Sequence, residues 1–274
     1  MSRCVVVLTD GLRPDAIRPG LTPHLHALGE DHTRARRAVT IRPSVTVAAL
    51  ASLATGVAPD SHGLVEPGLA FLSRIGRLRP LPQELMRHNL TTTVVAGVVG
   101  ATARHIARAL CSCAGVRRVV TAGRSAGEVA LEAAVEVRRA PPGLVFVYLS
   151  DCNRAGHASG WMSPEYLEAV REVDAAIGVV VRAAAGAHLM VLADHGGGGV
   201  EPRDHDLPHP VNDAIPLILA GPRVLRHYVL PREVSLLDVP PTVLAMLGLP
   251  VPAQYEGRAL VEAFVEEPCA EAVA

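Results

Sequence analysis

Short aliphatic runs recur along the chain, and nearly every position in each of them is apolar instead of every second one. Runs of this length and density are typical of strands that are buried on both faces, as in a parallel sheet. The runs that predict strands are "CVVVLT" (4–9), "TVVAGVV" (93–99), "LVFVYL" (144–149), "LMVLA" (189–193) and "PLILA" (216–220).

Between these runs the apolar positions recur with helical spacing. One helix is expected in "TPHLHALGE", with Thr22 as N-cap and Pro23 at the first helical position, and another opens at Ser163 and closes at Gly186. The stretches "VTVAALASLATG" and "AGEVALEAAVEVRRA" have the same character. Strands that alternate with helices predict an α/β fold with a doubly wound, mostly parallel sheet and helices on both of its faces.

The chain has 274 residues, enough to bury a large core. We expect a single domain over residues 1–262, without a large cap, followed by a loose tail over residues 263–274. Residues 63–92 form the least regular stretch, and we expect them to cover a site in part.

The charge of the chain is balanced, with 26 basic and 27 acidic residues. This balance argues against nucleic acid or an anionic membrane as a partner and favours a small molecule. All the basic residues are Arg, so Schiff-base chemistry and the phosphate-binding lysine of a P-loop are excluded.

The five Cys residues lack the spacing of a disulfide framework, and Cys111 and Cys113 have no second pair to complete a zinc knuckle. Reduced thiols are therefore expected. The apolar run near the N-terminus reaches Asp10 too early for a signal peptide or a membrane span, and we expect a cytoplasmic location.

Three of the aliphatic runs end at an acidic residue, namely Asp10, Asp151 and Asp194. An Asp after a strand is often only a turn former or the N-cap of the next helix. However, the carboxyl ends of parallel strands share one edge of a sheet, where ligands bind, so three such acids can converge.

Histidines accompany two of these acids. His195 follows Asp194 directly, His157 lies six residues after Asp151, and "RDHD" supplies His205. Imidazole and carboxylate together suit zinc or another divalent transition metal, whereas calcium takes oxygen ligands alone. The four glycines at 196–199 would let the chain turn sharply and leave the metal ligands open to substrate, and a flexible surface loop is the alternative.

A nucleophile is expected in "RPSVTVAALASLATG". Thr46 would lie at the N-terminus of a helix, where free backbone N–H groups favour an anion, and Val47 beside it is the expected substrate-binding residue. Ser44 or Thr46 could also be only an N-cap.

At these residues the chain resembles the alkaline phosphatase superfamily, nearest to its nucleotide pyrophosphatase/phosphodiesterase-like branch. The resemblance implies an alkaline phosphatase-like fold and a metal-dependent hydrolase of phosphate mono- or diesters on a small metabolite. It covers almost the whole domain, in order: "VVLTDGLRPD", "PSVTVAALASLATGVAPDSHGL", "YLSDCNRAGHASGWMSPEYLEAVREVD", "VLADHGGGG…RDHD", "IPLILAGP" and "SLLDVPPTVLAMLGLP".

The resemblance further implies two divalent ions, usually zinc, with manganese or another transition metal as the alternative. Thr46 would be the nucleophile and form a covalent phosphothreonine that metal-bound water hydrolyses. The ligands of the first ion would be Asp10, Thr46, Asp194 and His195, and those of the second would be Asp151 or Asn153 with His157 and His205.

Two positions depart from the family pattern. Relatives have an Asp ligand four residues before the histidine of "GH", where this chain has the uncharged Asn153, and we favour Asp151 as its replacement over an impaired site. Relatives also commonly carry a hydrogen-bond-donating Asn where this chain has Pro67, which has no donor.

Two further hypotheses stay open beside hydrolysis. The chain could be a metal-binding, catalytically degenerate relative that holds a phosphorylated ligand or partner without turnover, or a phosphotransferase or mutase that uses the same Thr46. A sulfatase is disfavoured, because the stretch "SVTVAAL" lacks the C/S-x-P-x-R sequence that sulfatases convert to formylglycine.

Overall fold

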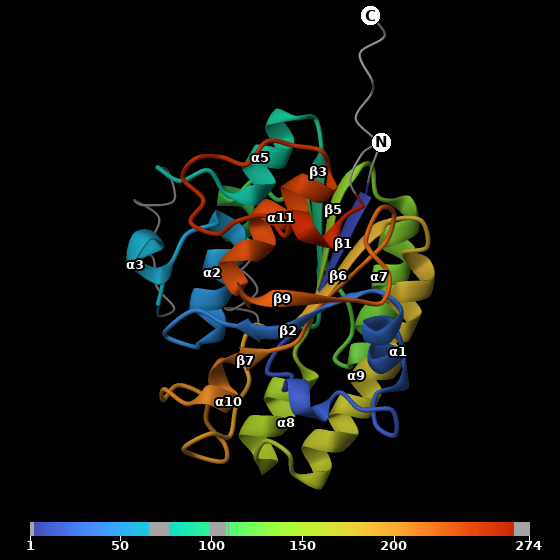
Figure 1. Cartoon of the computed structure of the whole chain (residues 1–274), viewed down its shortest axis with the longest axis vertical. Helices are drawn as coiled ribbons and strands as arrows, with labels where there is room; N and C mark the ends of the chain where they lie inside the picture. The colour runs from blue at the N-terminus through green and yellow to red at the C-terminus, as the bar shows by residue number, and fades with distance from the viewer. Residues whose placement is uncertain (1–2, 66–76, 99–107, 109, 266–274) are drawn as a thin grey trace, which may run out of the picture.

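A nine-stranded sheet forms the centre of the computed structural model, which describes residues 3–65, 77–98, 108 and 110–265 (Figure 1). The strand order is β4-β3-β5-β1-β6-β8-β2-β7, and β9 pairs with β2. The strands are β1 (Arg3–Thr9), β2 (Thr33–Val39), β3 (Thr91–Ala96), β4 (Arg118–Thr121), β5 (Gly143–Leu149), β6 (His188–Leu192), β7 (Ala214–Ile215), β8 (Leu217–Ala220) and β9 (Tyr228–Ser235).

The half of the sheet around β1 is parallel, as predicted. β1 pairs in parallel with β5 and β6, and β3 does so with β4 and β5. The expected strand at 216–220 is present as β8, but it runs antiparallel to β6. The chain passes from β6 to β8 through a loop and the four-residue α10 (Pro210–Asp213), without a long crossover helix to return it to the other end of the sheet.

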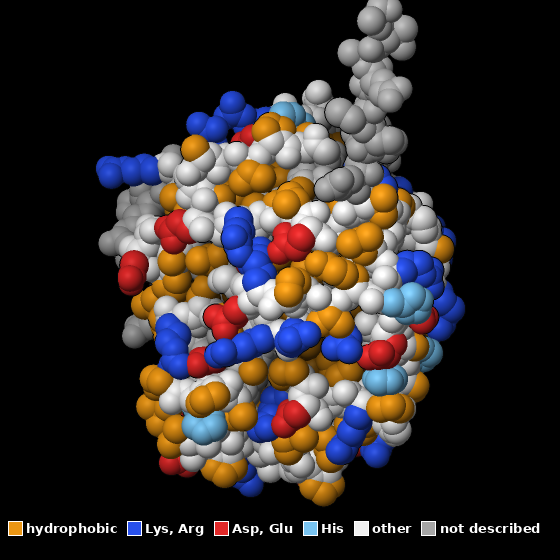
Figure 2. All heavy atoms as spheres, in the orientation of Figure 1, with side chains coloured by type: hydrophobic (Ala, Val, Ile, Leu, Met, Phe, Trp, Pro, Cys, Tyr) orange, Lys and Arg blue, Asp and Glu red, His pale blue; other side chains and the backbone are white. Residues whose placement is uncertain are grey.

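The sequence pattern did not predict β2, β4 or β9, because these strands lack a continuous apolar run. In β2 ("TRARRAV") the arginines lie in partly or fully exposed positions. Figure 2 shows basic and acidic side chains side by side over this part of the surface. Arg37 pairs with Glu233 of β9 at 2.9 Å, so the exposed face of the strand pair carries compensated charge.

Helices cover both faces of the sheet, as expected. In Figure 1, α1, α7 and α9 lie on one side of the central strands and α2 and α11 on the other. The helices are α1 (Pro23–Asp31), α2 (Thr46–Thr55), α3 (Pro59–His62), α5 (Leu81–Arg87), α7 (Ala126–Arg139), α8 (Asp151–Ser159), α9 (Pro164–Ala183), α10 and α11 (Val239–Met246), with 3-10 turns at Pro14–Ala16, Leu236–Asp238 and Val261–Ala263.

The helices begin where the sequence predicted, but the expected N-cap side chain does not always make the capping hydrogen bond. Ser163 caps α9, and its Oγ accepts from Tyr166 N at 3.2 Å. Thr22 is the N-cap residue of α1, yet its side chain makes no capping bond to the helix. The carboxylate of Asp174 in α9 accepts from His24 N and Leu25 N instead, so α1 is capped from a neighbouring helix.

The C-terminal end of the described chain stays attached to the domain. Phe264 forms a bridge with Val224, and Val265 N donates to Arg223 O at 2.7 Å. Residues 263–265 of the expected tail are therefore packed, and residues 266–274 lie outside the described residues. None of the described helices is both long and apolar enough to span a membrane.

Candidate active site

Asp10, Asp194 and His195 meet at the carboxyl ends of β1 and β6. Because these two strands are neighbours, the residues that follow them share one edge of the sheet. One ligand atom from each residue lies within 4.8 Å of those of the other two, and all three side chains are buried. His195 Nε2 is 3.2 Å from Asp10 Oδ1 and 3.7 Å from Asp194 Oδ2.

Thr46 is the first residue of α2, and its hydroxyl reaches this cluster. Oγ1 lies 3.1 Å from His195 Nε2 and 3.4 Å from Asp10 Oδ1. Val45 before it is extended, and Gly56 ends the helix in the left-handed conformation with a φ of +73°. The fold thus brings together three distant parts of the sequence, namely Asp10, Thr46 and the pair Asp194-His195.

The close approach of two buried carboxylates and an imidazole perturbs the pKa values within the cluster. Burial and the charge of Asp10 raise the pKa of Asp194 to about 7. Burial by itself lowers the pKa of His195, but the charges of Asp194 and Asp10 outweigh it and raise this pKa to about 9. Asp194 Oδ2 is buried and has no hydrogen-bond partner, whereas its Oδ1 accepts from Gly11 N and His195 N.

His157 and His205 lie beside this cluster. Their ring centroids are 5.1 Å apart, and the His205 ring stacks on that of His195 at 3.7 Å. His205 Nδ1 is 2.8 Å from Ser44 O, and His157 Nδ1 is 2.9 Å from Arg203 O. Burial and the neighbouring His195 lower the pKa of His205 to about 4, so its ring is neutral.

Asp151 and Asn153, the alternatives for the remaining ligand, occupy different environments. Asp151 Oδ1 accepts from Ala126 N at the start of α7 and from the Arg154 guanidinium at 2.7 Å. The Asn153 backbone N–H donates to Asp10 O, and its side-chain Oδ1 is buried without a hydrogen-bond partner. These contacts favour Asn153 over Asp151, contrary to our preference from the sequence.

The donor set fits divalent metal ions. Two carboxylates and an imidazole converge around one point, and Asp194 Oδ2 lacks the partner that a buried oxygen needs. In His157, His195 and His205, Nδ1 lies within hydrogen-bonding distance of a backbone carbonyl. For His195 this is the carbonyl of Gly196. This contact fixes the tautomer in which Nε2 is free to bind a metal.

Sequence reasoning missed two side chains that support the first ligand set. The Tyr148 hydroxyl, from β5, donates to Asp10 Oδ2, and the Thr40 hydroxyl donates to Asp194 O. Tyr148 is the one hydroxyl side chain within the apolar run "LVFVYL", and this was the signal that could have found it. His209 is not part of the cluster: it is the N-cap residue of α10, and its Nδ1 accepts from Val211 N.

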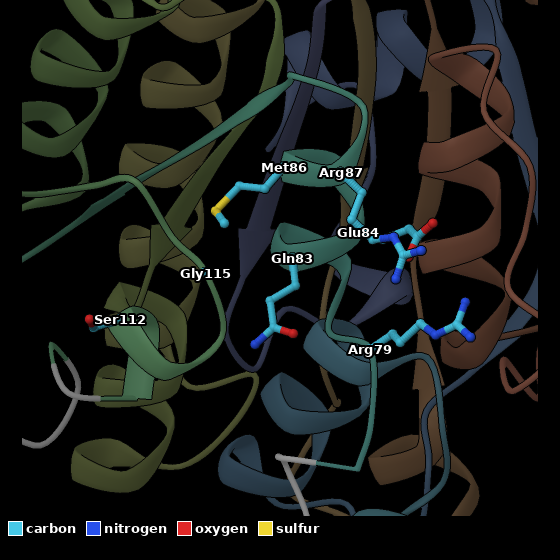
Figure 3. Close-up of a pocket in the computed structure, with 7 residues that line it drawn as sticks. All are labelled: Arg79, Gln83, Glu84, Met86, Arg87, Ser112 and Gly115. Carbon is cyan, nitrogen blue, oxygen red and sulfur yellow. The ribbon is translucent and has the colours of Figure 1, made fainter.

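A cavity of about 480 Å³ lies away from this cluster (Figure 3). It is lined by Arg79, by residues of α5 that include Gln83 and Arg87, and by Ser112 and Gly115. None of the predicted site residues lines it. Pro67 and part of the expected cover at 63–92, residues 66–76, lie outside the described residues.

The site thus combines a threonine hydroxyl at a helix N-terminus with a buried Asp–Asp–His cluster at one edge of an α/β sheet. The family model described as "Type I phosphodiesterase / nucleotide pyrophosphatase" matches residues 4–69 and 82–238. The chain belongs to this family, as the sequence motifs indicated.

Solved structures of low sequence identity share the fold. A phosphonate monoester hydrolase from Silicibacter pomeroyi superposes with a TM-score of 0.72 at 16% identity over 98% of this chain and 78% of its own. Human ectonucleotide pyrophosphatase/phosphodiesterase 5 also gives 0.72, at 12% identity over 93% of this chain and 97% of its own.

Curated relatives match only in part. A 2,3-bisphosphoglycerate-independent phosphoglycerate mutase from Rhodopirellula baltica is 32% identical over 145 residues, which are 50% of this chain and 26% of the relative. The chain thus spans about a quarter of the length of this relative.

Proposed function

We propose that the protein hydrolyses a phosphate ester of a small metabolite, with Thr46 as nucleophile and two divalent ions, zinc by preference, as cofactors. The observation that carries the proposal is the Thr46 hydroxyl, which lies 3.1 Å from His195 Nε2 and 3.4 Å from Asp10 Oδ1. A hydroxyl is a weak nucleophile near neutral pH, and a metal ion at these ligands would activate it.

In the reaction, Thr46 Oγ1 forms a bond to phosphorus while the bond to the leaving-group oxygen breaks, and water then displaces Thr46 from phosphorus. Asp10 Oδ1 accepts from the Thr46 hydroxyl and orients Oγ1. The first helical bond of α2 runs from Ala49 N to Val45 O, so the N–H groups before it, that of Val47 included, are available to a phosphoryl oxygen. The ions, when bound, lower the pKa of the hydroxyl and neutralise charge on the phosphoryl group.

Besides Thr46, six residues would hold the two ions. Asp10, Asp194 and His195 would hold the first, which makes the first site anionic. We propose Asn153, His157 and His205 for the second, because Asn153 Oδ1 lacks a partner and both imidazoles have Nδ1 at a backbone carbonyl. All three donors of the second site are neutral, so its ion would bind more weakly.

Metal content and esterase activity test the function directly. Protein reconstituted with zinc is expected to contain two ions per chain by elemental analysis and to release nitrophenol from a chromogenic phosphate mono- or diester. Protein that binds zinc but turns over no ester would support the second hypothesis, a relative that binds a phosphorylated ligand. Protein that binds no metal would contradict both.

The Asn153→Asp variant is expected to bind the second zinc roughly tenfold or more tightly, because a carboxylate adds a negative charge beside neutral donors. Asp151→Asn is the matched control. It should leave both zinc affinities within about threefold and lower the melting temperature, since it weakens the acceptor for Ala126 N and Arg154. Titration of zinc into the metal-free proteins measures both effects, and the opposite ranking would assign the ligand role to Asp151.

A phosphotransferase or mutase is the alternative function, and the observation that favours it is the partial similarity to phosphoglycerate mutases. It would use the same phosphothreonine but pass the phosphoryl group to an alcohol instead of water. Product analysis in the presence of added alcohols distinguishes transfer from hydrolysis. The cytoplasmic location stays a prediction from the sequence.

A further inference from the structure

Trp161 packs directly against Gly197 and Gly198, so that no side chain could be accommodated at these two positions. A Cβ at Gly197 would lie 2.2 Å from the indole, and one at Gly198 would lie 2.7 Å from Trp161 Cβ. A Cβ at Gly156 in α8 would also lie only 2.5 Å from the indole. These glycines are therefore required by close packing on one aromatic side chain, in addition to any freedom they give the backbone.

Both ends of Trp161 are anchored to segments that carry site residues. The indole Nε1–H donates to Gly11 O, directly after Asp10, at 2.9 Å. The backbone N–H donates to Pro202 O, three residues before His205, at 2.8 Å. The side chain is 6% exposed, so its position is fixed from both sides.

The indole also contacts the two imidazoles of the second ligand set. It meets the His157 ring edge to face, with centroids 5.1 Å apart and an interplanar angle of 80°. The His205 ring lies 5.6 Å away at 70°. His157 is an exposed residue on α8, so the Nδ1 contact with Arg203 O and the indole are what restrain its ring.

We propose that Trp161 is a positioning residue of the second metal site, which holds the His157 and His205 rings so that both Nε2 atoms face the same ion. The inference rests on the proposed two-metal function. Its physical basis is preorganisation: two rings that are already restrained lose little rotational freedom when the ion binds. Neutral donors attract an ion weakly, so the second site depends on this restraint more than the first.

The Trp161→Phe variant tests the role, with zinc titrated into the metal-free full-length protein by calorimetry. The second zinc is expected to bind about ten- to a hundredfold more weakly, as when outer partners of metal ligands are removed, and the first to change by less than about threefold. Leu230→Ala is the control, because Leu230 is fully buried in β9, which pairs with β2 and carries none of the site residues. It should lower the melting temperature and leave both zinc steps unchanged.

A second measurement uses the unaltered protein and needs no substitution of Trp161. Trp161 is the single Trp of the chain, so the intrinsic fluorescence of the unaltered protein reports on this indole. Its emission should change with the second zinc step, and this change should be absent in His157→Ala. Emission that follows only the first step, or that persists in His157→Ala, would overturn the inference.

The outcomes separate this inference from the proposed function. If the unaltered protein binds two zinc ions and the second binding step is unchanged in Trp161→Phe, only the role of Trp161 is contradicted, and the proposed function stands. The role of Trp161 is also contradicted if both zinc-binding steps are weakened in Trp161→Phe and to the same extent in Leu230→Ala, since general destabilisation would then be the cause. A single zinc ion per unaltered chain contradicts the two-metal function and this inference with it.

Discussion

Replacement of Thr46 by Ala is expected to lower kcat by a factor on the order of 10⁴–10⁶, which is the range for removal of a catalytic nucleophile. The reason is that Oγ1 is the atom that would attack phosphorus, and it is the hydroxyl that contacts both Asp10 and His195. The fold should persist, because Thr46 is only partly buried at the first position of α2. Steady-state kinetics on a chromogenic ester, with the melting temperature as the fold check, measure both.

Two control variants make this result specific. Thr46→Ser keeps a hydroxyl at the same place and should retain activity well above that of Thr46→Ala. Ser44→Ala removes the hydroxyl that donates to His205 O at 2.7 Å, so it should cost about 1–2 kcal/mol of stability and less than about tenfold in kcat. If Ser44→Ala were the inactive variant and Thr46→Ala active, Ser44 would be the nucleophile.

Replacement of Asp194 by Asn is expected to abolish tight zinc binding at the first site and to stabilise the metal-free protein. Both effects have one cause. Asp194 Oδ2 is a buried, unpartnered oxygen beside Asp10, and burial with that neighbouring charge raises the pKa of Asp194 to about 7. The amide removes both the repulsion by Asp10 and the attraction to His195, while its Oδ1 can still accept from Gly11 N. Because the pKa of Asp194 is raised despite His195, burial and the repulsion outweigh the attraction, and the variant should be the more stable protein.

The stability of the metal-free protein should depend on pH through the ionisation of Asp194. The folded-state pKa of Asp194 lies above the unfolded value, so its ionisation destabilises the fold at and above about pH 7, and this penalty declines as the pH falls towards about 4. The gain from Asp194→Asn should therefore be larger at pH 8 than at pH 5. Denaturant unfolding at both pH values with chelator present measures it. A variant that is less stable than the unaltered protein at pH 8 would show that the carboxylate is not under strain.

Local sequence determined the central strands and the helix starts. The run at 144–149 becomes β5, and the "VTVAALASLATG" pattern becomes α2 with Thr46 at its start and Gly56 at its end. These features depend on unbroken apolar runs and on the backbone preferences of single residues, and both can be read from neighbouring positions in the sequence. The strand β2 escaped prediction because three arginines interrupt its apolar residues, and its pairing with β8 and β9 is what makes it a strand.

The sequence alone also identified Asp10, Thr46, Asp194 and His195 as candidates from strand ends and motifs, and the structure brings their side chains together. From the sequence we favoured Asp151 over Asn153. Both residues lie within the first turn of α8, where side chains two positions apart point in different directions, so sequence position alone does not show which of them faces the site. Only the tertiary structure placed the N-terminus of α7 against Asp151 and left Asn153 Oδ1 without a partner. It likewise packed Trp161 on Gly197 and Gly198, since such contacts depend on how distant segments pack together and not on local spacing.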